Sequence, residues 1–127
     1  MINHENEVYD IVSKALQLEF KDIEIKDEKI PVTQQTFPAL SIVQIDNSIV
    51  EQYSTFDTLE NVVTEIYEFD AVSNLETNRA KQTRDMLSCV DNIMNLLGFT
   101  RIAYGPIVDE KENFVRRVVK YKKLYVN

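Results

Sequence analysis

The sequence predicts an α+β domain, a mainly antiparallel β-sheet of about four to five strands with two α-helices packed on one face. Three observations lead to this fold class. Segments with strand periodicity outnumber those with helical periodicity, strands separate the two helical segments, and the last two strands follow each other across a short polar turn. A chain of 127 residues fits one such domain, which we assign to residues 1–127.

The first element is expected to be an amphipathic helix over residues 5–20. Its apolar residues recur at three- and four-residue steps and therefore share one face: Val8, Ile11, Val12, Ala15 and Leu16. Asn3 stands where an N-cap residue is expected. Residues 22–32 then alternate polar and apolar side chains before Pro31 interrupts them, which predicts a short strand or an edge segment.

Two further strands are expected at residues 39–46 and 62–72, both rich in β-branched residues. In the second of these, four apolar residues share one face and two acidic residues occupy the other: Val63, Tyr67, Phe69 and Ala71 against Glu68 and Asp70. Glu65 interrupts the apolar face. We therefore expect it to lie near an edge or beside a basic partner.

A long connection of residues 47–61 joins these two strands and shows no clear period. It keeps large apolar side chains, among them Tyr53 and Phe56, that a solvent-exposed loop would rarely hold. Two interpretations are equally open. The segment either folds back on its own core or packs on a neighbouring subunit.

The second helix is expected to begin at a capping box formed by Ser73 and Glu76. Gly98 fits the left-handed position just after its end. The helix face consists of Ala80, Thr83, Met86, Leu87, Val90, Ile93, Met94 and Leu97. Residues 99–108 predict a short strand interrupted at Gly105-Pro106, and a polar turn then leads into a final strand over residues 114–126.

The final strand would span about 40 Å, which is long for a small domain. Both of its faces carry apolar residues: Phe114, Val118, Leu124 and Val126 on one, Val115, Val119, Tyr121 and Tyr125 on the other. Such a strand requires two apolar surroundings or a bulge that exchanges its faces. Burial within its own fold and contact with a neighbouring subunit both remain open.

The charge of the chain is divided unevenly. Residues 1–110 carry 8 basic and 20 acidic side chains, whereas residues 111–127 carry 6 basic and 1 acidic. The acidic majority repels nucleic acid, so DNA binding would depend on the basic C-terminal strand alone. That strand can instead pair with the acidic strand holding Glu65, Glu68 and Asp70, in the same chain or in the next subunit.

No set of residues in the sequence indicates catalysis or a cofactor. Two glycines, Gly98 and Gly105, are too few for a dinucleotide fingerprint and wrongly spaced for a phosphate-binding loop. The single histidine, His4, lies near a terminus expected to fray, and the single cysteine, Cys89, fits a small buried or half-buried helix residue. We therefore expect no enzyme activity, no cofactor and no metal site.

No membrane association or export is expected either. No apolar run approaches the length of about 18 residues that a membrane span requires. The N-terminal residues lack the basic and then apolar segments of a secretory signal. One cysteine allows no internal disulfide and fits a reducing compartment.

The order of segments in residues 37–127 resembles the tail terminator (tail completion, or head–tail joining) proteins of long-tailed bacteriophages of Gram-positive hosts. A strand with "YEF" leads through Ser73-Asn74 into a helix ending "LLGFTR", and a proline-containing linker precedes an "RRVVKY" strand. The segments "PALSIVQIDN" and "ENVVTEIYEFDAVSN" are also similar to those that precede the helix in that family. The turn "DEKEN" departs from the family's longer Asn/Asp-containing loop, so contacts of that loop do not carry over.

The resemblance implies a structural virion protein without catalysis. Such proteins form a ring, usually of six subunits, that caps the tail tube, stops its polymerisation and joins the tail to the head or neck. The implied partners are further copies of the chain, the tail tube protein and a neck or head-completion protein, with DNA passing only transiently through the lumen. The implied location is the head-proximal end of the virion tail, after assembly in the host cytoplasm.

On this interpretation two groups of residues have assembly roles. The expected subunit-interface residues are Tyr53, Phe56, Arg116, Arg117, Lys120, Tyr121 and Lys123. The expected lumen-lining acids are Glu65, Glu68 and Asp70, whose negative charge would repel DNA phosphates. Two alternatives remain: another head–tail connector component, such as a head-completion or stopper protein, and a nucleic-acid-binding module that uses the basic strand.

Overall fold

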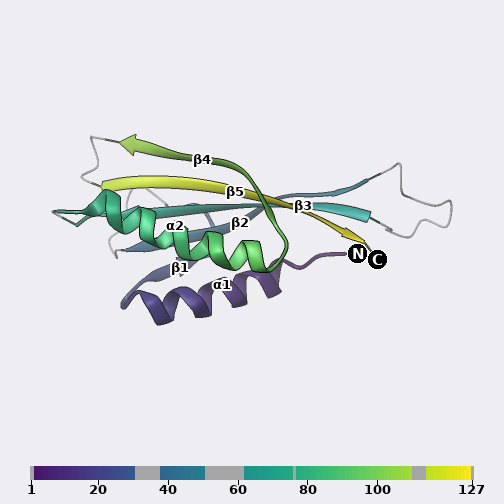
Figure 1. Ribbon diagram of the computed structural model, residues 1–127, viewed down its shortest axis with the longest axis horizontal. Coiled ribbons are helices and arrows are strands. Elements are labelled where there is room, and N and C mark those ends of the chain that lie inside the picture. The colour runs from purple at the N-terminus through teal and green to yellow at the C-terminus, as the bar shows by residue number, and fades with distance from the viewer. Residues whose placement is uncertain (1, 31–37, 51–61, 76, 110–113, 127) are drawn as a thin grey trace.

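The computed structural model describes residues 2–30, 38–50, 62–75, 77–109 and 114–126. Over these residues the chain forms two helices and one five-stranded mixed sheet, with both helices on the same face of the sheet (Figure 1). The elements are α1 (Glu5–Glu19), β1 (Glu24–Lys26), β2 (Ala39–Ile49), β3 (Val62–Ser73), α2 (Arg79–Leu96), β4 (Thr100–Asp109) and β5 (Phe114–Val126). The predicted α+β class is confirmed.

The strand order in the sheet is β1-β2-β3-β5-β4. The three-residue β1 runs parallel to β2, and the other neighbouring strands are antiparallel. The last strand of the chain therefore lies inside the sheet, between β3 and β4. Because β3 and β5 are paired from Val62 opposite Val126 to Ser73 opposite Val115, they form the central seam of the sheet.

The core lies between the sheet and the two helices. Most of the predicted apolar face of each helix is buried in it: Val8, Val12 and Leu16 from α1, and Met86, Leu87, Val90 and Met94 from α2. Ile11, also predicted to be on this face of α1, is 37% exposed. The buried residues pack with Tyr67 and Phe69 of β3 and Val119 and Tyr121 of β5. Each fully buried side chain of this size contributes about 1.5–3 kcal/mol, so this layer holds the helices on the sheet.

The start of α1 lies close to its predicted position. Asn3 Oδ1 accepts a hydrogen bond from the Glu5 amide at 3.1 Å, so Asn3 does bond a helix-terminal N–H as expected. The N-cap position itself belongs to His4, one residue later. The helix ends at Glu19, since Phe20 already has an extended backbone.

The predicted capping box at the start of α2 is wrong. Ser73 is the last residue of β3 and is fully buried, and its hydroxyl is hydrogen-bonded to the side chain of Gln82. The helix begins at Arg79, after Asn78 in the left-handed region (φ 62°). Glu76 lies outside the described residues. The end of α2 agrees with the prediction, because Gly98 has φ 87°.

β4 is not interrupted at Gly105-Pro106, contrary to the prediction. The strand is continuous and pairs with β5 on both sides of this dipeptide, and its one irregularity in register lies between Arg101 and Ala103. A proline is tolerated here because β4 is an edge strand of the sheet, where a missing backbone donor can face solvent.

β2 is three residues longer than predicted and continues through Ile49. The connection assigned to residues 47–61 therefore begins later than expected. Its residues Tyr53 and Phe56 lie outside the described residues, and their assignment to a subunit interface stays a prediction.

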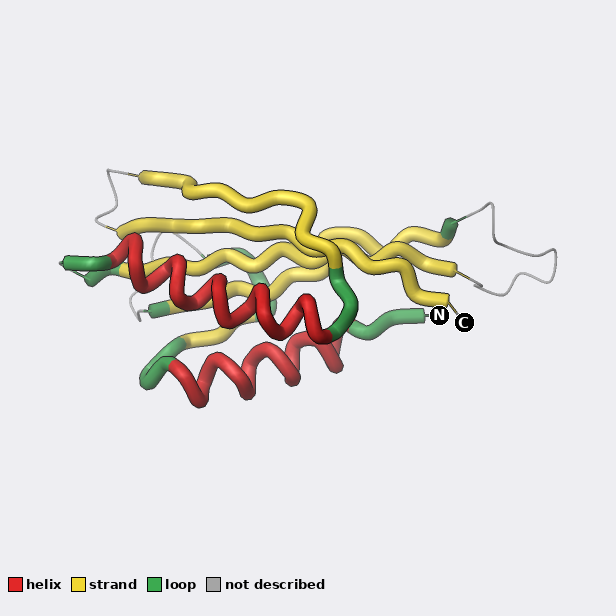
Figure 2. The backbone as a smooth tube through the Cα atoms, in the orientation of Figure 1, coloured by secondary structure: helices red, strands yellow, loops and turns green. Residues whose placement is uncertain are grey.

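The helices cover only part of the sheet. In Figure 2 the ends of β2, β3 and β5 continue past the helix layer, with the N-terminal segment and both termini beside them. Neither of the two described helices lies on the other face of the sheet. At one end of that face, Ile30 packs with Ala39 and Val72 in a small buried cluster.

Candidate functional site

The seam between β3 and β5 brings opposite charges together. In its register Glu65 lies opposite Lys123 and Glu68 lies opposite Lys120. Facing opposite charges on neighbouring strands contributes about 0.2–1 kcal/mol a pair. The predicted pairing of the basic strand with the acidic strand is therefore confirmed, and it occurs within one chain.

Asp70 and Arg116 form the most buried ion pair of the seam. Arg116 Nη1 lies 3.3 Å from Asp70 Oδ2, and their side chains are 13% and 3% exposed. Burial raises the pKa of Asp70 to about 6, although the Arg116 guanidinium opposes this change. Arg116 also donates to the Ile30 carbonyl at 3.0 Å and so holds the segment after β1 against the uncovered face of the sheet.

Glu65 does not lie near an edge, so of the two predicted alternatives the second, a basic partner, is the one that the structure supports, through His4. It is on the central strand β3 and is fully buried. Its carboxylate accepts hydrogen bonds from Tyr67 Oη at 2.6 Å, Gln44 Nε2 at 3.0 Å and the His4 amide at 3.2 Å. His4 Nδ1 lies 2.8 Å from the second carboxylate oxygen. The carboxylate thus has four polar contacts, two of which come from His4.

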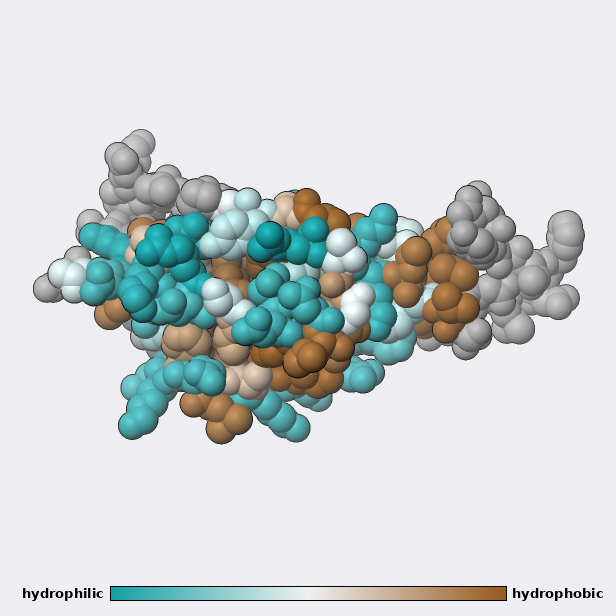
Figure 3. Space-filling model, in the orientation of Figure 1, coloured by the Kyte–Doolittle hydropathy of each residue, from teal (hydrophilic) through white to brown (hydrophobic). Residues whose placement is uncertain are grey.

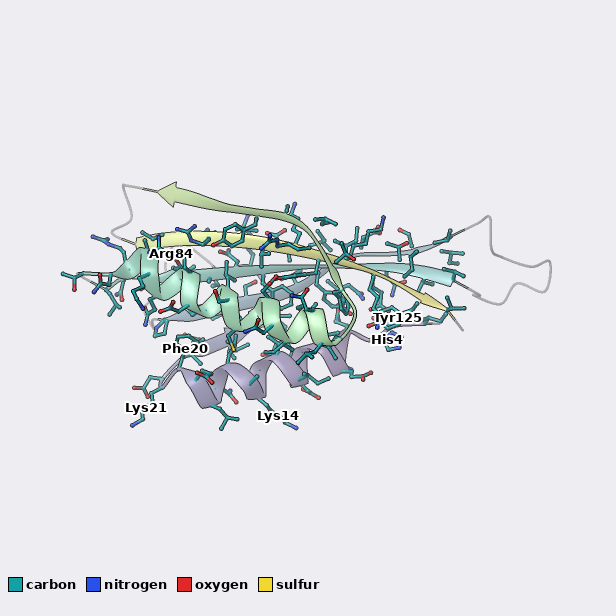
Figure 4. The ribbon with its side chains drawn as sticks, viewed as in Figure 1. His4, Lys14, Phe20, Lys21, Arg84 and Tyr125 are labelled. Atoms are coloured by element: carbon teal, nitrogen blue, oxygen red, sulfur yellow. The ribbon has the colours of Figure 1, made fainter. Side chains whose placement is uncertain are left out.

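The role of His4 was missed by the sequence analysis. Its ring stacks on Tyr125 with 3.8 Å between the ring centroids, and Figure 4 shows the two side chains together at the end of β5. Asn47 Nδ2 holds the same N-terminal segment by donating to the Ile2 carbonyl at 3.0 Å. No periodicity connects residue 4 with residue 65, so only the folded chain reveals this contact.

Lys123 is engaged within its own subunit. Its ammonium donates to the Leu97 carbonyl at 2.5 Å, where it satisfies the C-terminal end of α2. The same nitrogen lies 4.6 Å from the centroid of the Tyr125 ring. Burial, followed by the Glu65 charge, raises the pKa of Tyr125 to about 12. The hydroxyl therefore stays neutral at ordinary pH.

Arg117 and Tyr121 also make internal contacts. Arg117 Nε donates to Thr83 Oγ1 at 3.3 Å. Tyr121 is fully buried and donates to Asp91 Oδ1 at 2.6 Å, and burial raises its pKa well above the usual range. Tyr121 is thus a core residue within the subunit. Of the predicted interface residues on β5, Lys120 remains half-buried with its side chain on the uncovered face of the sheet.

The three predicted lumen acids differ in exposure. Glu65 and Asp70 are buried and have the partners given above, whereas Glu68 is half-exposed on the face without helices. Of these three acids, only Glu68 therefore has its carboxylate at the surface of the subunit. Its place in a lumen stays a prediction.

Exposed hydrophobic residues gather where the sheet extends past the helices. Figure 3 shows this patch together with a second patch over the C-terminal end of α2. At the far end of the sheet Leu124 is 52% exposed and Val126 77%, and Leu96 at the end of α2 is 88% exposed. Apolar surface is thus exposed both where the sheet extends past the helices and at the C-terminal end of α2.

The described residues contain no group of three or more histidine, cysteine or acidic side chains that could hold a metal. Cys89 is half-buried, and burial raises the pKa of its thiol, so the predicted unreactive helix position fits. Neither described helix has the length and hydrophobicity needed to cross a bilayer.

No protein-family model matches the chain, and no curated protein does. Among solved structures, the chain is similar to the PVC sheath/tube terminator of an extracellular contractile injection system, determined by cryo-EM in the extended state. The TM-score is 0.51 at 14% sequence identity, and the match covers 100% of this chain and 59% of that one. The chain therefore spans about three-fifths of the terminator's length. At this identity the likeness establishes a shared fold.

Proposed function

We propose that the protein is a structural component of tail assembly, a tail terminator that acts at the head-proximal end of a virion tail. The observation that carries this proposal is the match of the whole chain to the fold of a sheath/tube terminator. The resemblance of residues 37–127 to phage tail terminators supports the same role. The role requires no catalysis, no cofactor and no metal.

In the proposed mechanism the protein acts by binding to a surface and blocking it. Copies of the chain form a closed ring, six in number by analogy with the family, whose one face binds the last ring of tail tube protein. The ring then occupies the surface on which the next tube subunits would add, and polymerisation stops. Its opposite face receives a neck or head-completion protein, and DNA passes through the lumen.

A tube-length assay tests this function. Tail tube protein is polymerised with and without the purified chain, and tube lengths are measured by negative-stain electron microscopy. We expect defined lengths and a ring at one tube end when the chain is present. Tubes of unchanged length without a ring at either end would contradict the proposal.

Another head–tail connector component remains the alternative within the same structural class. A terminator binds the tube end of isolated tails, whereas a head-completion or stopper protein stays with the head. Immunogold labelling of separated heads and tails distinguishes them. Label on heads alone would favour the connector.

Nucleic-acid binding has less support than either assembly role. Arg116, Arg117 and Lys123, three of the five cations of β5, have partners within the subunit. A DNA-binding function would give salt-sensitive affinity that is lost when Lys120 and Lys122 are neutralised. We expect no such affinity at physiological salt.

A further inference from the structure

The N-terminal residues Ile2–His4, which we call the strap, lie against the part of the sheet that extends past the helices (Figure 2). β2 holds the first two of them through side-chain amides. Asn47 Nδ2 donates to the Ile2 carbonyl at 3.0 Å, and Gln44 Nε2 donates to Asn3 Oδ1 at 3.0 Å. Both are hydrogen bonds between neutral groups, so each of them holds the strap only weakly.

His4 connects the strap to β3 and β5. Its amide donates to Glu65 Oε1 at 3.2 Å, and its ring Nδ1 lies 2.8 Å from Glu65 Oε2. The ring also stacks on Tyr125 (Figure 4). Two further donors to the same carboxylate, Tyr67 and Gln44, belong to the sheet. Glu65 therefore keeps two hydrogen bonds when the strap leaves, so that its departure does not orphan a buried charge.

No side chain of residues 2–7 belongs to the buried core. Those of Glu5, Asn6 and Glu7 in the first turn of α1 are exposed, and Val8, at 2% exposure, is the first described residue to join the core. Segments with few buried apolar contacts open at a lower free energy than the core of the same domain. The core therefore holds α1 only from Val8 onward.

Two cavities flank the first turn of α1. One of about 270 Å³ separates it from β2 and is lined by Glu5, Asn6, Tyr9, Asp27, Ile42, Gln44 and Tyr67. The other, of about 200 Å³, separates it from the ends of α2 and β5 and is lined by His4, Glu7, Val8, Ile11, Leu97, Lys123 and Tyr125. Atoms that line a void lack packing partners and lose dispersion contacts. The turn is thus loosely packed toward both neighbouring layers.

We propose that the strap and the first turn of α1, residues 2–8, form a latch that opens as one unit while the rest of the fold stays intact. Opening uncovers Glu65 and Tyr125 on the helix side of the sheet, where the sheet extends past the helices. The latch thus controls whether another molecule can reach this surface. It is a device of the single subunit and does not depend on the proposed function.

Native-state hydrogen exchange of the full chain, followed by NMR at increasing urea, tests the latch. The Val8 amide donates to the His4 carbonyl at 2.9 Å and reports its opening. The amide of Val119, in the seam between β3 and β5, reports global unfolding. We expect Val8 to be protected about a hundredfold less than Val119. Its exchange should hardly depend on urea, because a local opening exposes little surface.

Two variants separate the latch from the rest of the fold. His4→Ala removes the ring contacts with Glu65 and Tyr125 and should speed exchange at Val8 about tenfold or more, because one partner is a carboxylate. Asn47→Ala removes one neutral hydrogen bond and leaves the donors of Glu65 in place, so we expect a smaller gain of about threefold to tenfold. Asn92→Ala is the matched control, since it makes the same change at an exposed position of α2 and should leave Val8 unchanged.

Three results would overturn the latch. The first is a Val8 amide that exchanges with the same protection and urea dependence as Val119, because residues 2–8 would then open only in global unfolding. The second is equal acceleration of both amides by His4→Ala and Asn47→Ala. The third is exchange at Val8 that neither variant changes.

Discussion

β3 carries two buried carboxylates, Glu65 and Asp70, whose surroundings differ. Glu65 faces the helix side of the sheet and accepts hydrogen bonds from Tyr67, Gln44 and the His4 amide, with the His4 ring beside it. Asp70 faces the opposite side and forms an ion pair with Arg116, and its Oδ1 atom has no hydrogen-bond partner among the described residues. Both residues are at most 2% exposed.

The difference shows that buried acids can serve two purposes in one strand. The satisfied carboxylate of Glu65 anchors the N-terminal segment to the sheet, because two of its four contacts come from His4. The Asp70 carboxylate keeps an unsatisfied oxygen, and burial raises its pKa to about 6. We infer that Glu65 contributes stability and N-terminal docking, whereas ionised Asp70 costs stability at neutral pH.

The largest effect is expected from Glu65→Ala. The change removes the acceptor of the Tyr67 hydroxyl and the His4 amide and one of the acceptors of Gln44. By analogy with broken buried pairs, this costs about 3–5 kcal/mol. Urea denaturation measures the free energy of unfolding. Glu65→Gln, which keeps the side-chain size and one acceptor oxygen, should lose only about 1–3 kcal/mol. Equal losses for both variants would contradict the network account.

A pH titration of stability tests Asp70. Its folded pKa of about 6 exceeds the ordinary value of 3.8, so the unfolded chain loses this proton first as the pH rises. The stabilising contribution is complete below about pH 4 and falls by up to about 3 kcal/mol as the pH rises through 6. The Asp70→Asn variant should lack this dependence of stability on pH. The Glu68→Gln variant, which changes a half-exposed acid, should retain it. A wild-type minus Asp70→Asn difference that stays flat from about pH 4 to 7 would refute this.

Gly98→Ala tests the packing of Lys123 beside the stacked rings of His4 and Tyr125. Gly98 has φ 87°, and an added Cβ would lie 3.3 Å from Lys123 Nζ. The strained backbone alone should cost about 1–2 kcal/mol, measured as a lower Tm. If the NMR signals that report stacking of the His4 ring on Tyr125 are lost, the substitution also disturbs the contacts around Glu65. An unchanged Tm would show that this backbone conformation is not required.

Lys81→Ala tests the smallest expected loss of stability, that of a surface ion pair. Lys81 and Asp85 form an exposed i,i+4 ion pair at 2.8 Å, with side chains 63% and 51% exposed. Because solvent screens this pair, its loss should cost only about 0.3–0.5 kcal/mol. Chemical denaturation at two salt concentrations provides the measurement. A loss as large as that of Glu65→Ala would undermine the distinction between buried and surface charges.

Local patterns were sufficient to predict most of the fold. The alternation in β3 and the three- and four-residue steps in α2 identify buried faces because each pattern reflects a single element packed on one side. The errors came where tertiary contact overrides a local signal. Ser73 matches a capping box, yet the sheet extends through it and buries it.

The candidate site was less predictable than the fold. The charge match between β3 and β5 follows from sequence because facing strands need opposite charges, and the register places Glu68 opposite Lys120. The partner of Glu65 does not follow, because His4 meets it only through folding across 61 residues. Nor does sequence alone reveal that Tyr121 is buried, since both faces of β5 carry apolar residues.

The central claim, that the chain forms a closed ring on a tail tube, is tested most directly by the mass and symmetry of its assembly. Native mass spectrometry of the purified chain, alone and with tail tube protein, gives the number of copies, and electron microscopy gives the symmetry. The account predicts a closed ring, of six copies by analogy with tail terminators. A chain that stays monomeric at high concentration in both samples and leaves tube length unaffected would contradict it.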